Sequence, residues 1–295
     1  MPNLQLEPKQ NLSSFRKIAL GTWKTAYDPS VYGSMDLDVT ETMEYIEQFR
    51  AKTGRKLTVT HLLARTAGAV MEEMPDANSI LRWGRLYVRK QVGVFFQVAM
   101  EDPETGEIDL SGATVHDPEK MSIVELMDAF DSQVKKVRKG EDEKLESSRN
   151  LFRSLPWFLV WPILNLIGFL GYTLNLDLRL LGVPKDAFGS LMITNIGSLG
   201  LSEAYVPLVP YSRIPLLLAV GEVKDRAVVV DGEIAIRKIM RISATFDHRV
   251  LDGMHASVMA RVMRQWMEHP FEHFDPIDDL SAEPAQLEAA EGEGA

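Results

Sequence analysis

The sequence predicts an α/β (α+β) protein: a two-layer fold in which a mixed β-sheet is flanked by helices. Three observations support this. Amphipathic helical patterns and apolar strand-like runs are mixed along the 295 residues. The two kinds of segment do not alternate regularly, as they would in a doubly wound parallel fold. A chain of this length, with 45% hydrophobic residues, can bury a large core.

Helices are predicted where apolar residues recur at helical spacing. Residues 38–54 carry Met43, Ile46 and Phe49 on one stripe, and Gly54 ends the pattern. Residues 57–78 are apolar on much of their surface up to Pro75, which is typical of a buried helix. Two amphipathic helices are also predicted, at residues 122–145 and 253–269.

Strands are predicted where short apolar runs end in turn residues. Four such runs cover residues 86–100, 189–200, 215–223 and 226–246. The last contains Asp231-Gly232 between alternating residues, a strong hairpin signal. Residues 1–14 are expected to form an extended arm.

Composition excludes several kinds of chemistry. The chain has no cysteine, which excludes disulfides, thiolate metal sites and a cysteine nucleophile. The net charge is −10, but seven acidic residues and no basic residue fall within 275–295. No basic stripe predicts nucleic-acid binding, and no histidine spacing predicts a metal site. The N-terminus lacks the apolar stretch of a signal peptide, so we expect a cytoplasmic protein.

One segment is unusual for a soluble domain. Residues 155–176 contain no charged residue, and their length permits a membrane span. Internal Pro and Gly residues argue against a single regular helix. Three interpretations stay open: a helical hairpin packed on protein, a membrane-surface element and a true span. We expect a pair of short helices near the substrate entrance, with Trp157, Phe158 and Trp161 as boundary anchors.

The stretch ATFDHRVLDG, residues 244–253, places a histidine between two carboxylates at the end of a strand. Near neutral pH a histidine can act as a general base, and the absence of cysteine implies that it deprotonates a substrate thiol or hydroxyl. Asp252 follows His248 by four positions, and Gly253 is expected to permit a tight turn. Acyl transfer also needs an oxyanion donor. Thr194 and Asn195, at a strand end, are the candidates.

At this point the residues carry a family resemblance. DHRVLDG (247–253) resembles the active-site signature of the 2-oxo acid dehydrogenase acyltransferases, the dihydrolipoyl acyltransferase core subunits. MITNIGSLG (192–200) resembles the strand and turn that precede that signature. FRKIAL (15–20), MDLDVTETMEYIEQFR (35–50) and the helical stretch 56–78 resemble the opening elements of the family, in the same order. The resemblance covers about residues 13–150 and 186–270.

The resemblance implies the fold of chloramphenicol acetyltransferase, assembled as a homotrimer with active sites between subunits. It implies that His248 takes a proton from a thiol, whose thiolate then attacks an acyl thioester. It also implies that Thr194 donates to the oxyanion and that Asp252 pairs with Arg16 to hold the histidine loop. CoA or acyl-CoA would be a substrate, with binding residues that stay unassigned.

Departures from the family pattern limit these expectations. We expect an acyltransferase catalytic domain at residues 1–275, an apolar insertion at about 151–185 and a disordered acidic tail at 276–295. No lipoyl domain precedes the core within this sequence, so we expect either a lipoyl group supplied in trans by a carrier protein or no lipoyl carrier at all. The tail lacks an apolar anchor, which favours a trimer over a larger cage. The alternatives are a non-catalytic trimeric scaffold and a membrane-associated acyltransferase with a lipid-like acceptor, docked through residues 155–176.

Overall fold

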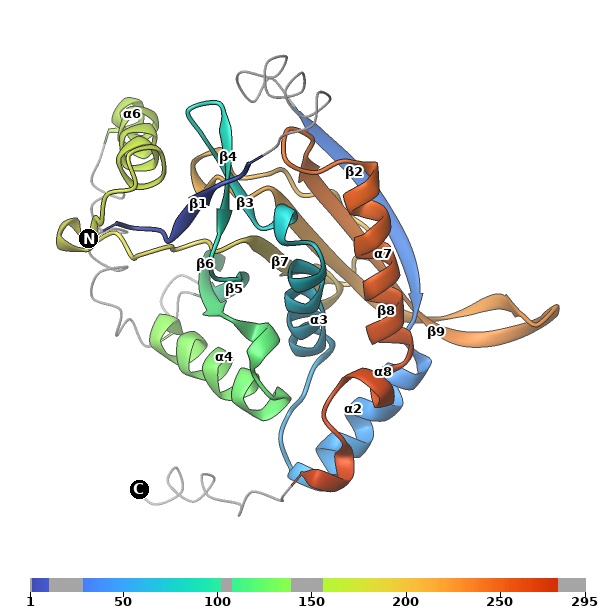
Figure 1. The fold of residues 1–295 in the computed structure, drawn as a ribbon. Helices are drawn as coiled ribbons and strands as arrows, with labels where there is room; N and C mark the ends of the chain where they lie inside the picture. The colour runs from blue at the N-terminus through green and yellow to red at the C-terminus, as the bar shows by residue number, and fades with distance from the viewer. Residues whose placement is uncertain (1, 11–28, 102–107, 139–155, 281–295) are drawn as a thin grey trace, which may run out of the picture.

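A computed structural model describes residues 2–10, 29–101, 108–138 and 156–280 (Figure 1). The strands are β1 (Leu6–Pro8), β2 (Ser30–Asp38), β3 (Ser79–Arg82), β4 (Arg85–Arg89), β5 (Gly93–Glu101), β6 (Ile108–His116), β7 (Leu191–Asn195), β8 (Leu216–Val230) and β9 (Glu233–Asp247). The α-helices are α2 (Thr40–Thr53), α3 (Val59–Glu73), α4 (Ile123–Arg138), α6 (Trp157–Gly168), α7 (Gly253–Glu268) and α8 (Pro270–His273).

A six-stranded mixed sheet in the order β2-β9-β8-β7-β5-β6 forms the centre of the molecule. The β5–β7 and β7–β8 pairs are parallel, and the other pairs are antiparallel. The predicted hairpin between β8 and β9 is confirmed: Asp231 and Gly232 have φ values of 52° and 87°, as a tight two-residue turn requires. Beyond its contact with β2, this hairpin projects from the body of the protein (Figure 1).

The main hydrophobic core lies between this sheet and the helices α2, α3, α4 and α7 (Figure 1). Alternate strand residues point into it, because successive side chains of a strand face opposite sides. Leu218 of β8 and Ile193 of β7 are almost fully buried there, as are Leu63 of α3 and Met263 of α7. The helices predicted at 38–54, 57–78 and 253–269 are therefore confirmed as the layer that covers one face.

The opposite face of the sheet is covered by a loop, which we call the strap (residues 196–214). Val206, Leu208, Val209 and Ile214 of the strap form a small apolar cluster with Met192 of β7 and Leu217 of β8. The strap also makes a polar contact, an ion pair between Glu203 and Arg241 of β9 at 2.8 Å. The backbone of the strap lies close to β8: a Cβ on Gly221 would come 2.3 Å from the carbonyl oxygen of Ser202.

A second, three-stranded antiparallel sheet has the order β1-β4-β3. It brings the N-terminal arm against the apolar segment at 156–184. Asn3 donates to the carbonyl of Gly171 at 3.2 Å, and the backbone N–H of Leu4 donates to Asn175 at 2.6 Å. Tyr172 is buried with Leu4 and Ile80 in a separate small core. The segment is thus attached to the domain by hydrogen bonds as well as by apolar contacts.

The structure corrects two expectations about these regions. Residues 155–176 do not form a pair of helices, because α6 continues into a π-helical turn at Phe169–Thr173 despite the internal Pro162. The ordered body also extends past residue 275, since Ile277 and Leu280 pack against the main core. The rest of the predicted acidic tail, residues 281–295, lies outside the described residues. No helix within the described ranges is long and apolar enough to span a membrane.

Candidate active site

His248 occupies the turn between β9 and α7. Its backbone N–H donates to the carbonyl oxygen of Pro29 at 2.9 Å, which ties the turn to the start of β2. Its ring atom Nδ1 lies 2.8 Å from the carbonyl oxygen of Leu251. Because a carbonyl oxygen can only accept, Nδ1 must carry the proton in this contact. In the neutral ring Nε2 is then the basic atom, which is the tautomer that a general base needs.

The residues on both sides of His248 form an ion pair that shapes the turn. The guanidinium of Arg249 contacts both carboxylate oxygens of Asp247, with Nη2 at 2.7 Å and Nε at 2.9 Å. Such two-point contacts restrict orientation as well as adding energy. Burial, followed by the positive charge of Arg249, lowers the pKa of Arg213 from its ordinary value. Arg213 therefore lies close enough to Arg249 for the two positive charges to repel each other.

Asp252 is the N-cap of α7. Its carboxylate accepts hydrogen bonds from the backbone N–H groups of Met254 at 3.0 Å and His255 at 3.2 Å. The Nδ1 atom of His255 lies 2.7 Å from the same carboxylate oxygen, so His255 completes a capping box. Asp252 is therefore built into the helix start that follows His248. Its predicted pairing with Arg16 stays a prediction, because Arg16 lies outside the described residues.

The role predicted for Gly253 was wrong. Gly253 is the first residue of α7 and does not have a positive φ. A Cβ at this position would meet no heavy atom within 4 Å. Its backbone conformation and its surroundings therefore do not require glycine, and the cap at Asp252 is what starts the helix.

Thr194 and Asn195 end β7 on opposite faces of the sheet. Thr194 lies on the strap face, and its hydroxyl donates to the Oε1 atom of Gln97 on β5 at 2.9 Å. Asn195 faces the helices, where its amide donates to the hydroxyl of Thr60 at 3.0 Å and its Oδ1 accepts from the N–H of Ser198. Only Thr194 therefore shares a face with the polar residues at the end of β9.

His248 and Thr194 do not lie close together within a single chain. Thr194 pairs with Ala219 of β8, which in turn pairs with Ser243 of β9. His248 follows Ser243 by five residues, which corresponds to about 16 Å along an extended strand, with two strand spacings across. The two predicted catalytic side chains therefore lie at separate places on one chain.

Sequence reasoning missed two residues of this site. Gln97 holds the Thr194 hydroxyl, and the available signal was a single polar residue inside the apolar run VGVFFQVAM. His255 holds Asp252, and the signal was the Asp-x-x-His spacing of a capping box. The structure groups no three His, Asp or Glu residues in a metal-binding arrangement among the parts it describes.

Comparison with known proteins identifies the family of the chain. The family model described as 2-oxoacid dehydrogenases acyltransferase (catalytic domain) matches residues 7–150 and 185–274. A dihydrolipoyllysine-residue acetyltransferase component of the acetoin cleaving system from Bacillus subtilis is 25% identical over 219 residues, which cover 74% of this chain and 43% of that protein. The chain spans less than half the length of the curated relatives it matches.

Solved structures show the same fold. The dihydrolipoamide acetyltransferase of Azotobacter vinelandii, in which a serine, a histidine and an asparagine were investigated for their role in the catalytic mechanism, has a TM-score of 0.60 at 20% identity, covering 91% of this chain and 93% of that one. A chloramphenicol acetyltransferase has a TM-score of 0.50 at 12% identity, covering 89% of this chain and all of the other. The predicted fold class is therefore confirmed.

Proposed function

Because the chain belongs to the catalytic-domain family of the 2-oxoacid dehydrogenase acyltransferases, we propose that it transfers an acyl group between CoA and a thiol or hydroxyl acceptor. The observation that carries the proposal is the 2.8 Å contact between Nδ1 of His248 and the carbonyl oxygen of Leu251, which leaves Nε2 as the basic atom. Retention of His248 together with Thr194 favours an enzyme over a non-catalytic scaffold of the same fold.

The proposed reaction runs through a tetrahedral intermediate. Nε2 of His248 accepts the proton of the attacking thiol or hydroxyl, whose sulfur or oxygen then bonds to the carbonyl carbon of the acyl thioester. The hydroxyl of Thr194 turns from Gln97 to donate to the oxyanion. When the carbon–sulfur bond of the thioester breaks, protonated His248 returns its proton to the leaving thiolate.

Asp252 acts in this scheme by positioning rather than by proton transfer. Its carboxylate is engaged by the first turn of α7 and by His255. In the Azotobacter protein the investigated histidine and asparagine are four residues apart, which is also the separation of His248 and Asp252. An aspartate in the place of an asparagine adds a negative charge, which the N-terminus of α7 can offset.

We place the working active site between two copies of the chain, in a homotrimer, because one chain separates His248 from Thr194. A second observation supports assembly: the tip of the β8–β9 hairpin exposes Val229, Ile234 and Ile236, each more than 70% accessible in the single chain. Exposed apolar side chains on a projecting hairpin favour burial against another subunit. A larger assembly is the alternative, and a related solved structure is the cubic core of a pyruvate dehydrogenase multienzyme complex.

Mixing two inactive variants tests the reaction and the assembly together. His248→Ala and Thr194→Ala would each be assayed for transfer from acetyl-CoA to dihydrolipoamide, and then coexpressed. If each site takes its histidine and threonine from different copies, random mixing restores about a quarter of the sites. Light scattering reports the size of the particle. Mixed oligomers without activity would contradict the shared site, and an inactive wild type over a panel of thiol and alcohol acceptors would favour the scaffold.

The acyl donor can come from two sources in this proposal. Acyl-CoA is the first, and a lipoyl group supplied in trans by a carrier protein is the second. Transfer rates with free dihydrolipoamide and with a separate lipoylated carrier domain would distinguish them. A rate that rises at least tenfold with the carrier, at equal lipoyl concentration, would indicate a carrier partner.

The apolar segment supports a second proposal: a cytoplasmic protein that attaches to a membrane surface through this segment. Trp161 is 75% exposed and Leu180 is 99% exposed. Trp83, at the tip of the β3–β4 hairpin, is 64% exposed and meets the ring of Phe169 edge-on at 6.0 Å. Exposed tryptophans beside an uncharged helix are typical of segments that lie in a membrane interface. A lipid-like acceptor would reach the enzyme there.

Vesicle sedimentation with phosphatidylcholine tests this attachment. We expect the wild type to sediment and the double variant Trp161→Ser, Leu180→Ser to stay in solution. Leu199→Ser removes another exposed leucine, 71% accessible, from a different part of the surface and should sediment like the wild type. If the wild type stays in solution, the apolar surface does not serve a membrane, and a concentration-dependent particle size would assign it to protein association.

A further inference from the structure

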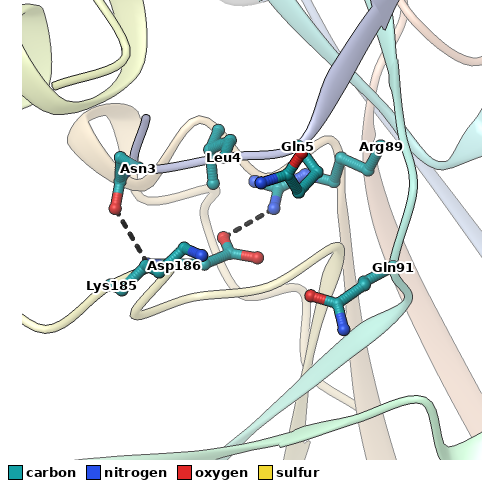
Figure 2. Close-up of a pocket in the computed structure, with 7 residues that line it drawn as sticks. All are labelled: Asn3, Leu4, Gln5, Arg89, Gln91, Lys185 and Asp186. Carbon is teal, nitrogen blue, oxygen red and sulfur yellow. Dashed lines mark hydrogen bonds and ion pairs between the residues drawn. The ribbon is translucent and has the colours of Figure 1, made fainter. Parts of the chain in front are cut away.

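A small pocket opens where the N-terminal arm, β4 and the end of the apolar segment meet (Figure 2). Its volume is about 270 Å³, including its open mouth. The lining residues are Asn3, Leu4, Gln5, Arg89, Gln91, Lys185 and Asp186. Arg89, Lys185 and Asp186 lie within the ranges that the family model matches, whereas the arm residues of the pocket precede the first matched residue.

Arg89 is the unusual residue of this pocket, because it is only 5% exposed. Its Nη1 atom donates to Asp186 at 2.6 Å. Its Nε and Nη2 atoms are buried and have no hydrogen-bond partner among the described residues. Buried guanidinium donors without partners are costly, since the group has lost its water. Nη1 thus has a hydrogen-bond acceptor in the protein, whereas Nε and Nη2 have none among the described residues.

The two donors without a partner belong to one edge of the guanidinium. Nε–H and one N–H of Nη2 point in parallel, and this edge matches two oxygens of a carboxylate or phosphate. Figure 2 shows the guanidinium between Gln5 and the carboxylate of Asp186. Lys185 adds a second positive charge at the exposed rim, so the lining residues carry two positive charges and one negative charge. The pocket therefore favours an anion.

The walls of the pocket are held in place before any ligand arrives. The backbone N–H of Asp186 donates to Oδ1 of Asn3 at 3.2 Å. Asn3 in turn donates to Gly171, and Leu4 is bonded through its backbone to Asn175 in both directions. Asp186 has a φ of 46°, in the left-handed region, and its carboxylate accepts the hydrogen bond from Arg89. A preformed site loses less entropy on binding.

We propose that this pocket binds a small oxyanion, a carboxylate or phosphate group, on the Nε/Nη2 edge of Arg89 with Lys185 at the rim. The ligand is a free small anion or the anionic end of a larger molecule that reaches the pocket through its mouth. This inference is independent of acyl transfer, because none of the pocket residues belongs to the proposed catalytic machinery.

Isothermal titration of the full chain with sodium phosphate and with sodium acetate, against sodium chloride at matched ionic strength, tests the proposal. We expect saturable binding of at least one oxyanion and none of chloride, and the preferred anion distinguishes phosphate from carboxylate. Lys185→Gln should weaken binding about fivefold, as the loss of one nearby exposed charge predicts. Arg89→Lys should weaken it at least tenfold, because an ammonium cannot offer two parallel donors.

Arg85→Gln is the matched control, since Arg85 is an exposed cation on the same strand outside the pocket. It should bind as the wild type does. The proposal fails if the wild type shows no saturable heat with either oxyanion, or if Lys185→Gln and Arg89→Lys both bind as tightly as the wild type. Should Arg89→Lys not fold, judged by circular dichroism, the wild type and Lys185→Gln decide the question.

Discussion

The two faces of the six-stranded sheet present different kinds of side chain. On the helix face, Leu218 and Ile193 pack into the main core, and the neighbouring strand residues are also apolar. On the strap face the same strands present Thr194, Gln97 and Ser243. The strap adds only a small apolar cluster, around Met192 and Leu217, to this face, whereas the helices bury a much larger apolar core. The helix face therefore supplies stability, and the strap face holds the polar groups that chemistry can use.

The largest effect expected from the strap side is the loss of the base. His248→Ala should lower the acyl-transfer rate by about 10²–10⁴-fold, because it removes proton transfer from the transition state. Stopped-time assays of CoA release measure the rate, and thermal unfolding checks the fold. His269→Ala is the control, since His269 is an exposed histidine at the far end of α7. A His248 variant with full turnover would overturn the assignment of the base.

Removing the Thr194 hydroxyl, at the end of β7, should lower the acyl-transfer rate somewhat less than removing His248 does. Thr194→Ala should lower kcat by up to about 10²–10³-fold, the range for one oxyanion donor, with little change in KM. Thr194→Ser keeps the hydroxyl and should keep most of the activity. Gln97→Ala should have a smaller effect, because Gln97 only orients the donor. Equal loss in the Ala and Ser variants would instead indicate a packing role for the threonine methyl group.

On the helix face, a truncation should affect stability rather than rate. Leu218→Ala should lower the free energy of unfolding by about 2–5 kcal/mol, the cost of lost burial plus a cavity. Leu218 has no measurable exposure and lies in the main core. Urea unfolding gives the free energy, and the rate per folded molecule should match the wild type. A stable variant with low activity would contradict the division between the two faces.

Lowering the pH should lower the free energy of unfolding through His61, a buried histidine of α3 on the helix face. Burial lowers the pKa of His61 to about 4, below its ordinary value of 6.5, because the charged ring is disfavoured in the core. As the pH falls from 6.5 to about 4, His61 is therefore protonated in the unfolded chain but stays neutral in the folded chain. Over that window the free energy of unfolding should fall by up to about 3 kcal/mol from this group, and it should be constant above it.

Urea unfolding of the wild type and of His61→Gln between pH 4 and pH 8 measures this contribution. The variant should be less stable at pH 8, where the neutral histidine packs edge-on against Phe130 at 4.8 Å. It should also lose less stability than the wild type on acidification. If the free energy of unfolding falls with pH equally in the two proteins, His61 does not cause the loss of stability in acid.

The smallest effect is expected for a polar group on the strap face. The hydroxyl of Ser243 is buried and has no hydrogen-bond partner in the described parts of the chain. Ser243→Ala should therefore leave the free energy of unfolding unchanged or raise it by about 1 kcal/mol, since it removes an unsatisfied polar group. Urea unfolding measures this, with Leu218→Ala as the opposite case. A loss above 1 kcal/mol would mean that the hydroxyl has a stabilising partner in the assembled protein.

Local sequence patterns determined most of the elements and the motif that contains the base. The stripes in residues 38–54 and 253–269 predict helices because burial repeats with the helical period. Asp231-Gly232 predicts the hairpin because these two residues tolerate the positive φ values of a tight turn. The order of DHRVLDG after a long strand also placed His248 at a strand end. These features depend on neighbours along the chain, which a sequence displays directly.

Only the tertiary structure decided which side chains meet. Thr194 and Asn195 are adjacent in sequence, yet the pleat sends one to Gln97 and the other to Thr60. The pairing of β7, β8 and β9 set the distance between Thr194 and His248 within one chain. The contact of Arg89 with Asp186 joins residues 97 positions apart. Such contacts follow from strand register and from packing between distant segments, and a pattern of neighbouring residues carries no information about either.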